Sequence, residues 1–210
     1  MKKLLMEFIG TFFFIFTIAM TSNPFAIAAM LMAWIYIGGS VSGAHYNPAV
    51  TLAVALRGRL AWDAVPGYMI AQVLGGFVAF ALTYFFKNSI AITQPGLGVT
   101  FLQAFIMETL LAFVLALVVL VVATWDKFRL NHIFGFAIGF TIPALAALGS
   151  PVSGGLFNPA IALGSVLFGL TQRIPLVWQD LGMYVGGALL GGVLAAYAFR
   201  YFILDEDYLS

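Results

Sequence analysis

The chain has 210 residues, of which 63% are hydrophobic and only 8% are charged, and its mean hydropathy is +1.06. A soluble domain is about half apolar and about a quarter charged, so this composition excludes a soluble enzyme, a nucleic-acid-binding protein and a disordered chain. A net charge of +1 and the absence of cysteine exclude a strongly charged partner surface, disulfide bonds and thiolate metal sites.

Six mostly apolar stretches are candidates for transmembrane helices, which need about 20 residues to cross a bilayer. In chain order they are residues 4–21, 25–39, 66–86, 101–124, 131–148 and 177–202. The start of the chain, Met1-Lys2-Lys3 before an apolar run, is also typical of a secretory signal, but Glu7 interrupts that run. We therefore expect the first stretch to be a transmembrane helix.

The positive charges predict the orientation of these spans, because cytoplasmic loops are enriched in Lys and Arg. With a cytoplasmic N-terminus, only Lys87 and Arg173 lie outside. The cytoplasmic side then holds seven cationic residues, namely Lys2, Lys3, Arg57, Arg59, Lys127, Arg129 and Arg200. This bias predicts that both termini are cytoplasmic.

Two further apolar stretches, 47–57 and 158–169, are too short to span a bilayer. Each begins with the same three residues, Asn47-Pro48-Ala49 in the first and Asn158-Pro159-Ala160 in the second. Asn is a good N-cap, and Pro is tolerated at the first helical position. The pattern predicts half-helices that begin inside the membrane, where irregular backbone is tolerated only if it is buried or lines a water-filled cavity.

The two short stretches belong to an internal repeat. Residues 41–52 match residues 152–163 at an offset of 111, and seven of the twelve positions are identical. Each half, about 1–87 and 101–203, has three spans and one Glu in its first span, Glu7 or Glu108. An odd number of spans inverts the second half relative to the first. Inverted repeats with broken helices at the midplane are typical of a permeation pathway, so we expect one channel domain over 1–210.

With these motifs the chain resembles the aquaporin family, the major intrinsic proteins. Residues 7–11 (Glu-Phe-Ile-Gly-Thr) resemble the first-helix motif of that family, and residues 71–76 (Ala-Gln-Val-Leu-Gly-Gly) resemble its third-helix motif. The resemblance implies an all-α membrane protein with six transmembrane helices and two re-entrant half-helices. It also implies a homotetramer with one pore in each subunit.

In such a pore the two half-helices meet at their N-termini, where free N–H groups and the helix dipole raise the energy of a cation. We expect Asn47 and Asn158 to donate to a passing oxygen, so that ions and protons are excluded. The residues before each Asn should run extended, with their carbonyls along the path. These residues are Gly43, Ala44, His45 and Tyr46 in the first half, and Gly154, Leu156 and Phe157 in the second.

Glu7 and Glu108 are the two carboxylates deep within predicted spans. Intramembrane acids often couple transport to protons. Here we favour the alternative that each accepts hydrogen bonds from the loop before a half-helix, as the family resemblance also implies. We expect His45 to take part in this bracing rather than to bind a metal, because the other histidine, His132, lies at the far end of the fifth span.

The chain departs from the family at the outer constriction. Spacing from the two Asn-Pro-Ala motifs places Ile27, Ala146, Gly155 and Ile161 there. The family usually has an aromatic residue at the first position, often a His at the second and nearly always an Arg at the fourth. The glycerol-conducting branch often has an Asp where this chain has Ala162. The sequence therefore predicts a wide, apolar constriction without a fixed cation.

We expect a passive channel for water and other small neutral solutes in the plasma membrane, with the lipid bilayer as its surroundings and without a cofactor, a metal or a nucleic-acid partner. One alternative is a glycerol or small-solute facilitator with little water selectivity. Another is a coupled secondary transporter, which would need titratable groups in the path. A structural or adhesive protein would need a loop surface that the short loops do not offer. Enzyme activity is not expected, since no nucleophile–base pair is apparent.

Overall fold

The computed structural model describes residues 1–89, 94–128, 130–173 and 178–204. Arg129, one of the seven cationic residues above, lies outside this part, as does the first residue of the predicted span 177–202. Within the described residues the fold is built from helices. The long ones are α1 (Lys2–Met20), α2 (Pro24–Ser42), α4 (Val65–Lys87), α5 (Phe101–Val119), α6 (Phe134–Gly149) and α8 (Trp178–Phe199). The fold class predicted from the sequence is confirmed.

The ends of the long helices carry short irregular turns. The π-helical segments Leu120–Thr124 and Arg200–Leu204 extend α5 and α8, and the 3-10 turns Trp62–Ala64 and Asp126–Phe128 lie in the connections. Five of the described helices are long and apolar enough to cross a membrane. The remaining predicted span, the fifth in chain order, is α6, which has 16 residues and is therefore about 24 Å long, somewhat shorter than the hydrocarbon layer of about 30 Å.

The two predicted half-helices are α3 (Pro48–Leu56) and α7 (Pro159–Thr171). Local capping explains where each begins. The Asn47 side chain accepts a hydrogen bond from the Ala49 N–H at 2.8 Å, and the Asn158 side chain accepts one from the Ala160 N–H at 3.0 Å. The proline between the cap and the donating alanine occupies the first helical position, where a missing N–H leaves no hydrogen bond unmade.

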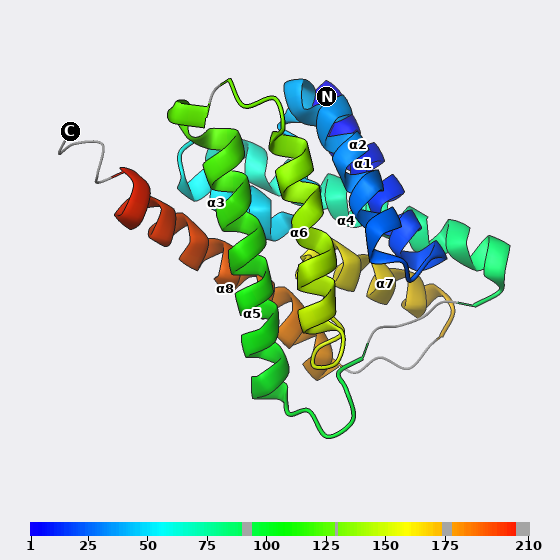
Figure 1. The fold of residues 1–210 in the computed structure, drawn as a ribbon. Helices are drawn as coiled ribbons and strands as arrows, with labels where there is room; N and C mark the ends of the chain where they lie inside the picture. The colour runs from blue at the N-terminus through cyan, green and yellow to red at the C-terminus, as the bar shows by residue number, and fades with distance from the viewer. Residues whose placement is uncertain (90–93, 129, 174–177, 205–210) are drawn as a thin grey trace.

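Figure 1 shows the helices packed together in one bundle. Glycines on α4 and α8 bring some of these helices into backbone contact. A Cβ added to Gly76 would lie 2.6 Å from the Ala160 carbonyl oxygen, and one added to Gly192 would lie 2.4 Å from the Ala49 carbonyl oxygen. Each half-helix therefore packs against the third span of the other repeat. This close packing is the explanation that the sequence favours for an apolar chain rich in glycine.

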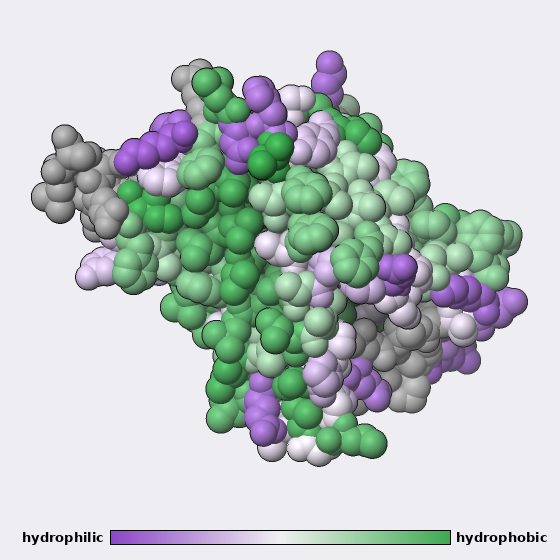
Figure 2. All heavy atoms as spheres, viewed as in Figure 1, coloured by the Kyte–Doolittle hydropathy of each residue, from purple (hydrophilic) through white to green (hydrophobic). Residues whose placement is uncertain are grey.

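The outer surface is apolar. Figure 2 shows hydrophobic residues over α5 and α6, with hydrophilic residues toward the two ends of this face. Large exposed side chains on this surface include Leu102, Ile106, Leu110, Phe136 and Phe140. Such a belt would be unstable in water and is stable against lipid tails, so the chain is an integral membrane protein.

Candidate functional site

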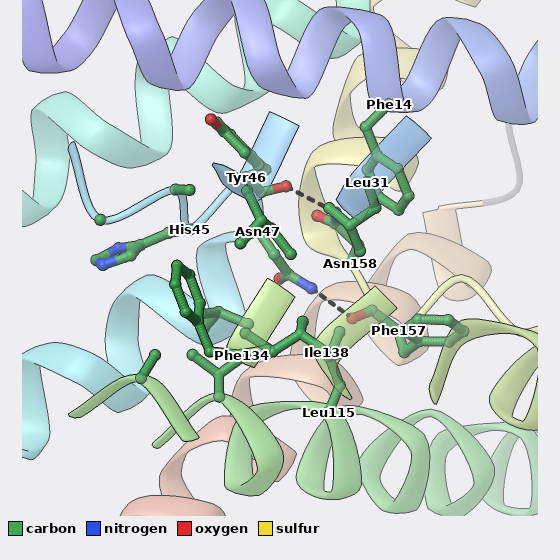
Figure 3. Close-up of a pocket in the computed structure, with 16 residues that line it drawn as sticks. Phe14, Leu31, His45, Tyr46, Asn47, Leu115, Phe134, Ile138, Phe157 and Asn158 are labelled. Carbon is green, nitrogen blue, oxygen red and sulfur yellow. Dashed lines mark hydrogen bonds between the residues drawn. The ribbon is translucent and has the colours of Figure 1, made fainter. Parts of the chain in front are cut away.

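The two half-helices meet at their N-termini and hold each other there. The Asn47 Nδ2 donates to the Phe157 carbonyl at 3.0 Å, and the Asn158 Nδ2 donates to the Tyr46 carbonyl at 3.0 Å (Figure 3). Each contact joins the cap of one half-helix to the loop before the other. The arrangement is reciprocal, as an inverted repeat requires.

Both asparagines line a central cavity of about 30 Å³, which has room for about one or two water molecules. An amide NH2 group has two N–H bonds, and the contacts found among the described residues use one of them in each asparagine. Among the described residues the second N–H of each asparagine has no acceptor. The N-termini of α3 and α7 add about half a positive charge each at the same point.

Glu7 braces the loop before α3, residues 43–46. Its Oε1 accepts from the Ser42 hydroxyl at 2.6 Å and the His45 N–H at 3.0 Å. Its Oε2 accepts from the Tyr46 N–H at 2.8 Å and from the Gln72 amide at 2.8 Å. The carboxylate is fully buried, and four donors compensate for its loss of water.

Glu108 braces the loop before α7, residues 154–157, in the same way but with fewer partners. Its Oε1 accepts from the Ser153 hydroxyl at 2.6 Å and the Leu156 N–H at 3.0 Å, and its Oε2 accepts from the Phe157 N–H at 2.5 Å. Among the described residues no amide corresponds to Gln72, because Ala188 stands three residues before Gly191 on α8, where α4 has Gln72 three residues before Gly75. The second cradle is therefore less polar.

The backbone of these loops differs from the extended path that the sequence predicts. Gly43, Ala44 and Tyr46 have φ values of +91°, +53° and +49°, and Phe157 has +33°. These left-handed residues curl the chain, so that the N–H groups of His45 and Tyr46 converge on the Glu7 carboxylate. The carboxylate thus explains the curl, and the hydrogen bonds stabilise a conformation that costs about 1–2 kcal/mol for each non-glycine residue.

His45 lies inside the first cradle. Its Nδ1 is 3.2 Å from the Thr51 hydroxyl, which also accepts from the Gln72 amide at 2.9 Å. The ring is 9% exposed. This contact ties the imidazole to α3, and its expected part in bracing the loop stays a prediction.

A larger cavity of about 600 Å³ adjoins one end of the central cavity, and Phe14 and Phe157 line both. We call it the Ala146 cavity. All four residues assigned to the outer constriction, Ile27, Ala146, Gly155 and Ile161, line it, as do Gly154 and Leu156. Lys87 also borders it, with its Nζ donating to the Ala19 and Met20 carbonyls at 3.0 Å each.

A third cavity of about 660 Å³, which we call the His132 cavity, adjoins the other end. Gly43, Ala123 and Phe134 line both it and the central cavity. Arg59 and Asp126 form an ion pair at 2.6 Å on its wall. The three cavities therefore follow one another through the bundle, with the two asparagines at the narrow middle.

Sequence reasoning missed several polar partners. Ser42 and Ser153 stand inside the repeated motif, so the repeat itself was a usable signal. The Tyr68 and Tyr184 hydroxyls donate to the Ser42 and Ser153 carbonyls at 2.8 and 2.6 Å. These tyrosines are 116 positions apart rather than 111 (184 − 68), so the repeat offset does not reveal them.

Spanning helices, an inverted repeat and two half-helices that meet at a line of cavities define a membrane channel. The family model described as "Major intrinsic protein" matches residues 1–199. The chain belongs to this family, and it is a channel for water and small solutes rather than an enzyme.

Individual relatives agree with this assignment. The chain is 34% identical to "Aquaporin NIP1-4" of Oryza sativa subsp. japonica, over 99% of this chain and 79% of the relative. It is 31% identical to "Glycerol uptake facilitator protein-like 6" of Lactiplantibacillus plantarum, over 95% and 97%. The fold matches the X-ray structure of the aquaglyceroporin from Plasmodium falciparum with a TM-score of 0.85 and 22% identity, over 100% of this chain and 99% of that chain.

Proposed function

We propose that the protein conducts water and small uncharged solutes passively, and that it excludes ions and protons. The observation that carries this proposal is the meeting of the α3 and α7 N-termini at the central cavity, with Asn47 and Asn158 at its wall. Two facing positive helix ends raise the energy of a cation there. The spare amide N–H groups bind the oxygen of a neutral solute instead.

The carboxylates support passive conduction over proton-coupled transport. Both oxygens of Glu7 and of Glu108 accept hydrogen bonds from the protein. Protonation would replace an acceptor with a donor that faces another donor. A group held in this way is suited to bracing a loop and poorly suited to cycling a proton.

The residues of the predicted outer constriction keep their proposed place at the Ala146 cavity. Ile27, Ala146, Gly155 and Ile161 offer a solute no hydrogen-bonding side chain and no cation. The carbonyls before each half-helix supply acceptors, and those of Tyr46 and Phe157 also hold the opposite asparagine. A relative whose name describes glycerol uptake and the 600 Å³ cavity favour a second candidate function, a glycerol facilitator with little water selectivity.

We also propose the setting in which the channel works. The distribution of Lys and Arg favours cytoplasmic termini, and we place the channel in the plasma membrane. The family resemblance favours a homotetramer in which residues 1–210 of each subunit form one channel domain.

Stopped-flow light scattering on proteoliposomes tests the proposal. Osmotic water flow should exceed that of empty liposomes and should not change when a proton or sodium gradient is imposed. A potential-sensitive dye in the same vesicles should report no ion current. Flux that required a gradient would overturn passive conduction in favour of coupled transport. Parallel measurements with glycerol, urea and ammonia decide between the two candidate functions.

A further inference from the structure

We infer that the size limit of this channel is set by a ring on the His132 side of the two asparagines, not by the predicted outer constriction. This ring, the Ile35 ring, consists of Ile35, Ala44, Val50 and Ile138. The inference rests on the proposed function, and it says which part of the channel determines which solutes pass.

The inverted repeat defines this ring. The four positions of the predicted outer constriction form the Ile27 ring, and each has a counterpart 111 positions away in the other repeat. The counterparts of Ile27, Ala146, Gly155 and Ile161 are Ile138, Ile35, Ala44 and Val50, respectively. All four counterparts line the central cavity, so the structure places them around one passage.

Side-chain volume makes the two rings unequal. Where the Ile27 ring has Ala146 and Gly155, the Ile35 ring has the larger Ile35 and Ala44. Val50 is one methylene smaller than Ile161, which offsets only a small part of this difference. The Ile35 ring is therefore the narrower of the two on composition alone.

The cavities agree with this comparison. The Ile27 ring borders a cavity of about 600 Å³, whereas the Ile35 ring borders the cavity of about 30 Å³. Ile35, Ile138 and Val50 are only 3%, 4% and 3% exposed. In the Ile27 ring, Ile161 alone is buried. The Ile27 ring, which has Ile161 where the family nearly always has an arginine, is thus wide, but it is not the narrowest point of the path.

Phe134 extends the narrow passage by one helical turn. It precedes Ile138 by four residues on α6, so the two side chains share a face. It lines both the central cavity and the His132 cavity, and its ring packs 5.3 Å from that of Tyr36. Figure 3 shows Phe134, Ile138 and Leu115 on one side of the asparagines and Phe14 and Leu31 on the other.

The chemistry of the passage determines what it rejects. Apart from His45, its other side chains are aliphatic or aromatic, so a solute finds few hydrogen bonds beyond the asparagines, the loop carbonyls and this imidazole. Water can satisfy its few hydrogen bonds there. A solute with several hydroxyl groups must leave some of them unsatisfied. We therefore expect the wild type to pass water much faster than glycerol.

A matched pair of substitutions tests the location. Ile138→Ala and Ile27→Ala make the same change at repeat-related positions. Ile138→Ala should raise the glycerol-to-water permeability ratio about fivefold, because room for one more solute hydrogen bond is equivalent to about 1 kcal/mol. Ile27→Ala should leave the ratio unchanged. Both ratios are measured in proteoliposomes by stopped-flow light scattering.

Ala146→Ile tests the same location by narrowing the Ile27 ring instead of widening it. The test therefore remains decisive if an alanine variant fails to fold. It gives the Ile27 ring the side chain that Ile35 has, and the 600 Å³ cavity has space for it. It should leave the permeability ratio unchanged. A fall in the ratio with Ala146→Ile, or a rise with Ile27→Ala equal to that with Ile138→Ala, would overturn the inference while leaving passive conduction intact. Absence of water flow in the wild type would instead overturn the proposed function and this inference with it.

Discussion

Replacing each bracing carboxylate by its amide should destabilise the two halves unequally. Glu7→Gln and Glu108→Gln each convert one acceptor oxygen into an NH2 group. In both cradles each oxygen accepts from a backbone N–H. One N–H of the loop before a half-helix is therefore left without its acceptor in either variant, at a cost of about 1–3 kcal/mol.

The first cradle has a means of compensation that the second lacks. The Gln72 Oε1 is buried and has no hydrogen-bond partner among the described residues, while its Nε2 donates to Glu7 and to Thr51. If the Gln72 amide rotates, its oxygen can accept from the new NH2 group at position 7. At the corresponding place in the second half Ala188 cannot do so. We expect Glu7→Gln to be less destabilising than Glu108→Gln by about 1 kcal/mol, the net value of one hydrogen bond.

Alanine substitutions set the scale for this comparison. Glu7→Ala removes the acceptor of both the His45 and Tyr46 N–H groups, so the expected loss is about 2–6 kcal/mol. Thermal unfolding in detergent ranks the three variants, and water flux in proteoliposomes shows whether the folded fraction conducts. Equal stability of Glu7→Gln and wild type would refute the bracing argument. Loss of flux in Glu→Gln variants with unchanged unfolding temperature would make proton coupling the better account.

Three further predictions concern the caps, the glycines and the Ala146 cavity. Asn47→Ala or Asn158→Ala removes an N-cap worth about 1 kcal/mol and a contact across the repeat; the unfolding temperature should fall, and a double variant with unchanged yield and water flux would contradict the geometry. Gly192→Ala places a Cβ 2.4 Å from a carbonyl oxygen of the half-helix α3 and should destabilise by about 1–3 kcal/mol. Gly182→Ala is its control in the same unfolding assay, since no atom lies within 4 Å of an added Cβ there. Ile161→Arg adds a long cationic side chain to the 600 Å³ cavity and should reduce glycerol passage more than water passage in stopped-flow measurements; an unchanged ratio would show that the side chain lies outside the path.

The sequence by itself determined those features that depend on local rules or on the repeat. Asn followed by Pro is a cap and a first helical residue wherever it stands, so the starts of α3 and α7 could be predicted to the residue. Because inversion follows from an odd number of spans, the repeat also predicted that the two half-helices face each other. The presence of one Glu in the first span of each half also paired Glu7 with Glu108.

Only the tertiary structure decided how the loops before the half-helices are built and where the path is narrowest. The left-handed residues Ala44 and Tyr46 are neither glycine nor in a turn motif, and they are held by a carboxylate from another helix, a contact of long sequence separation. The hydrogen bonds of the Tyr68 and Tyr184 hydroxyls likewise depend on how α4 and α8 are rotated about their axes. The offset of the repeat does not predict that rotation. The width of each ring depends on side chains from α2, α6, one loop and one half-helix. These residues meet only when the two repeats pack together, so a local sequence pattern cannot predict the space that they leave.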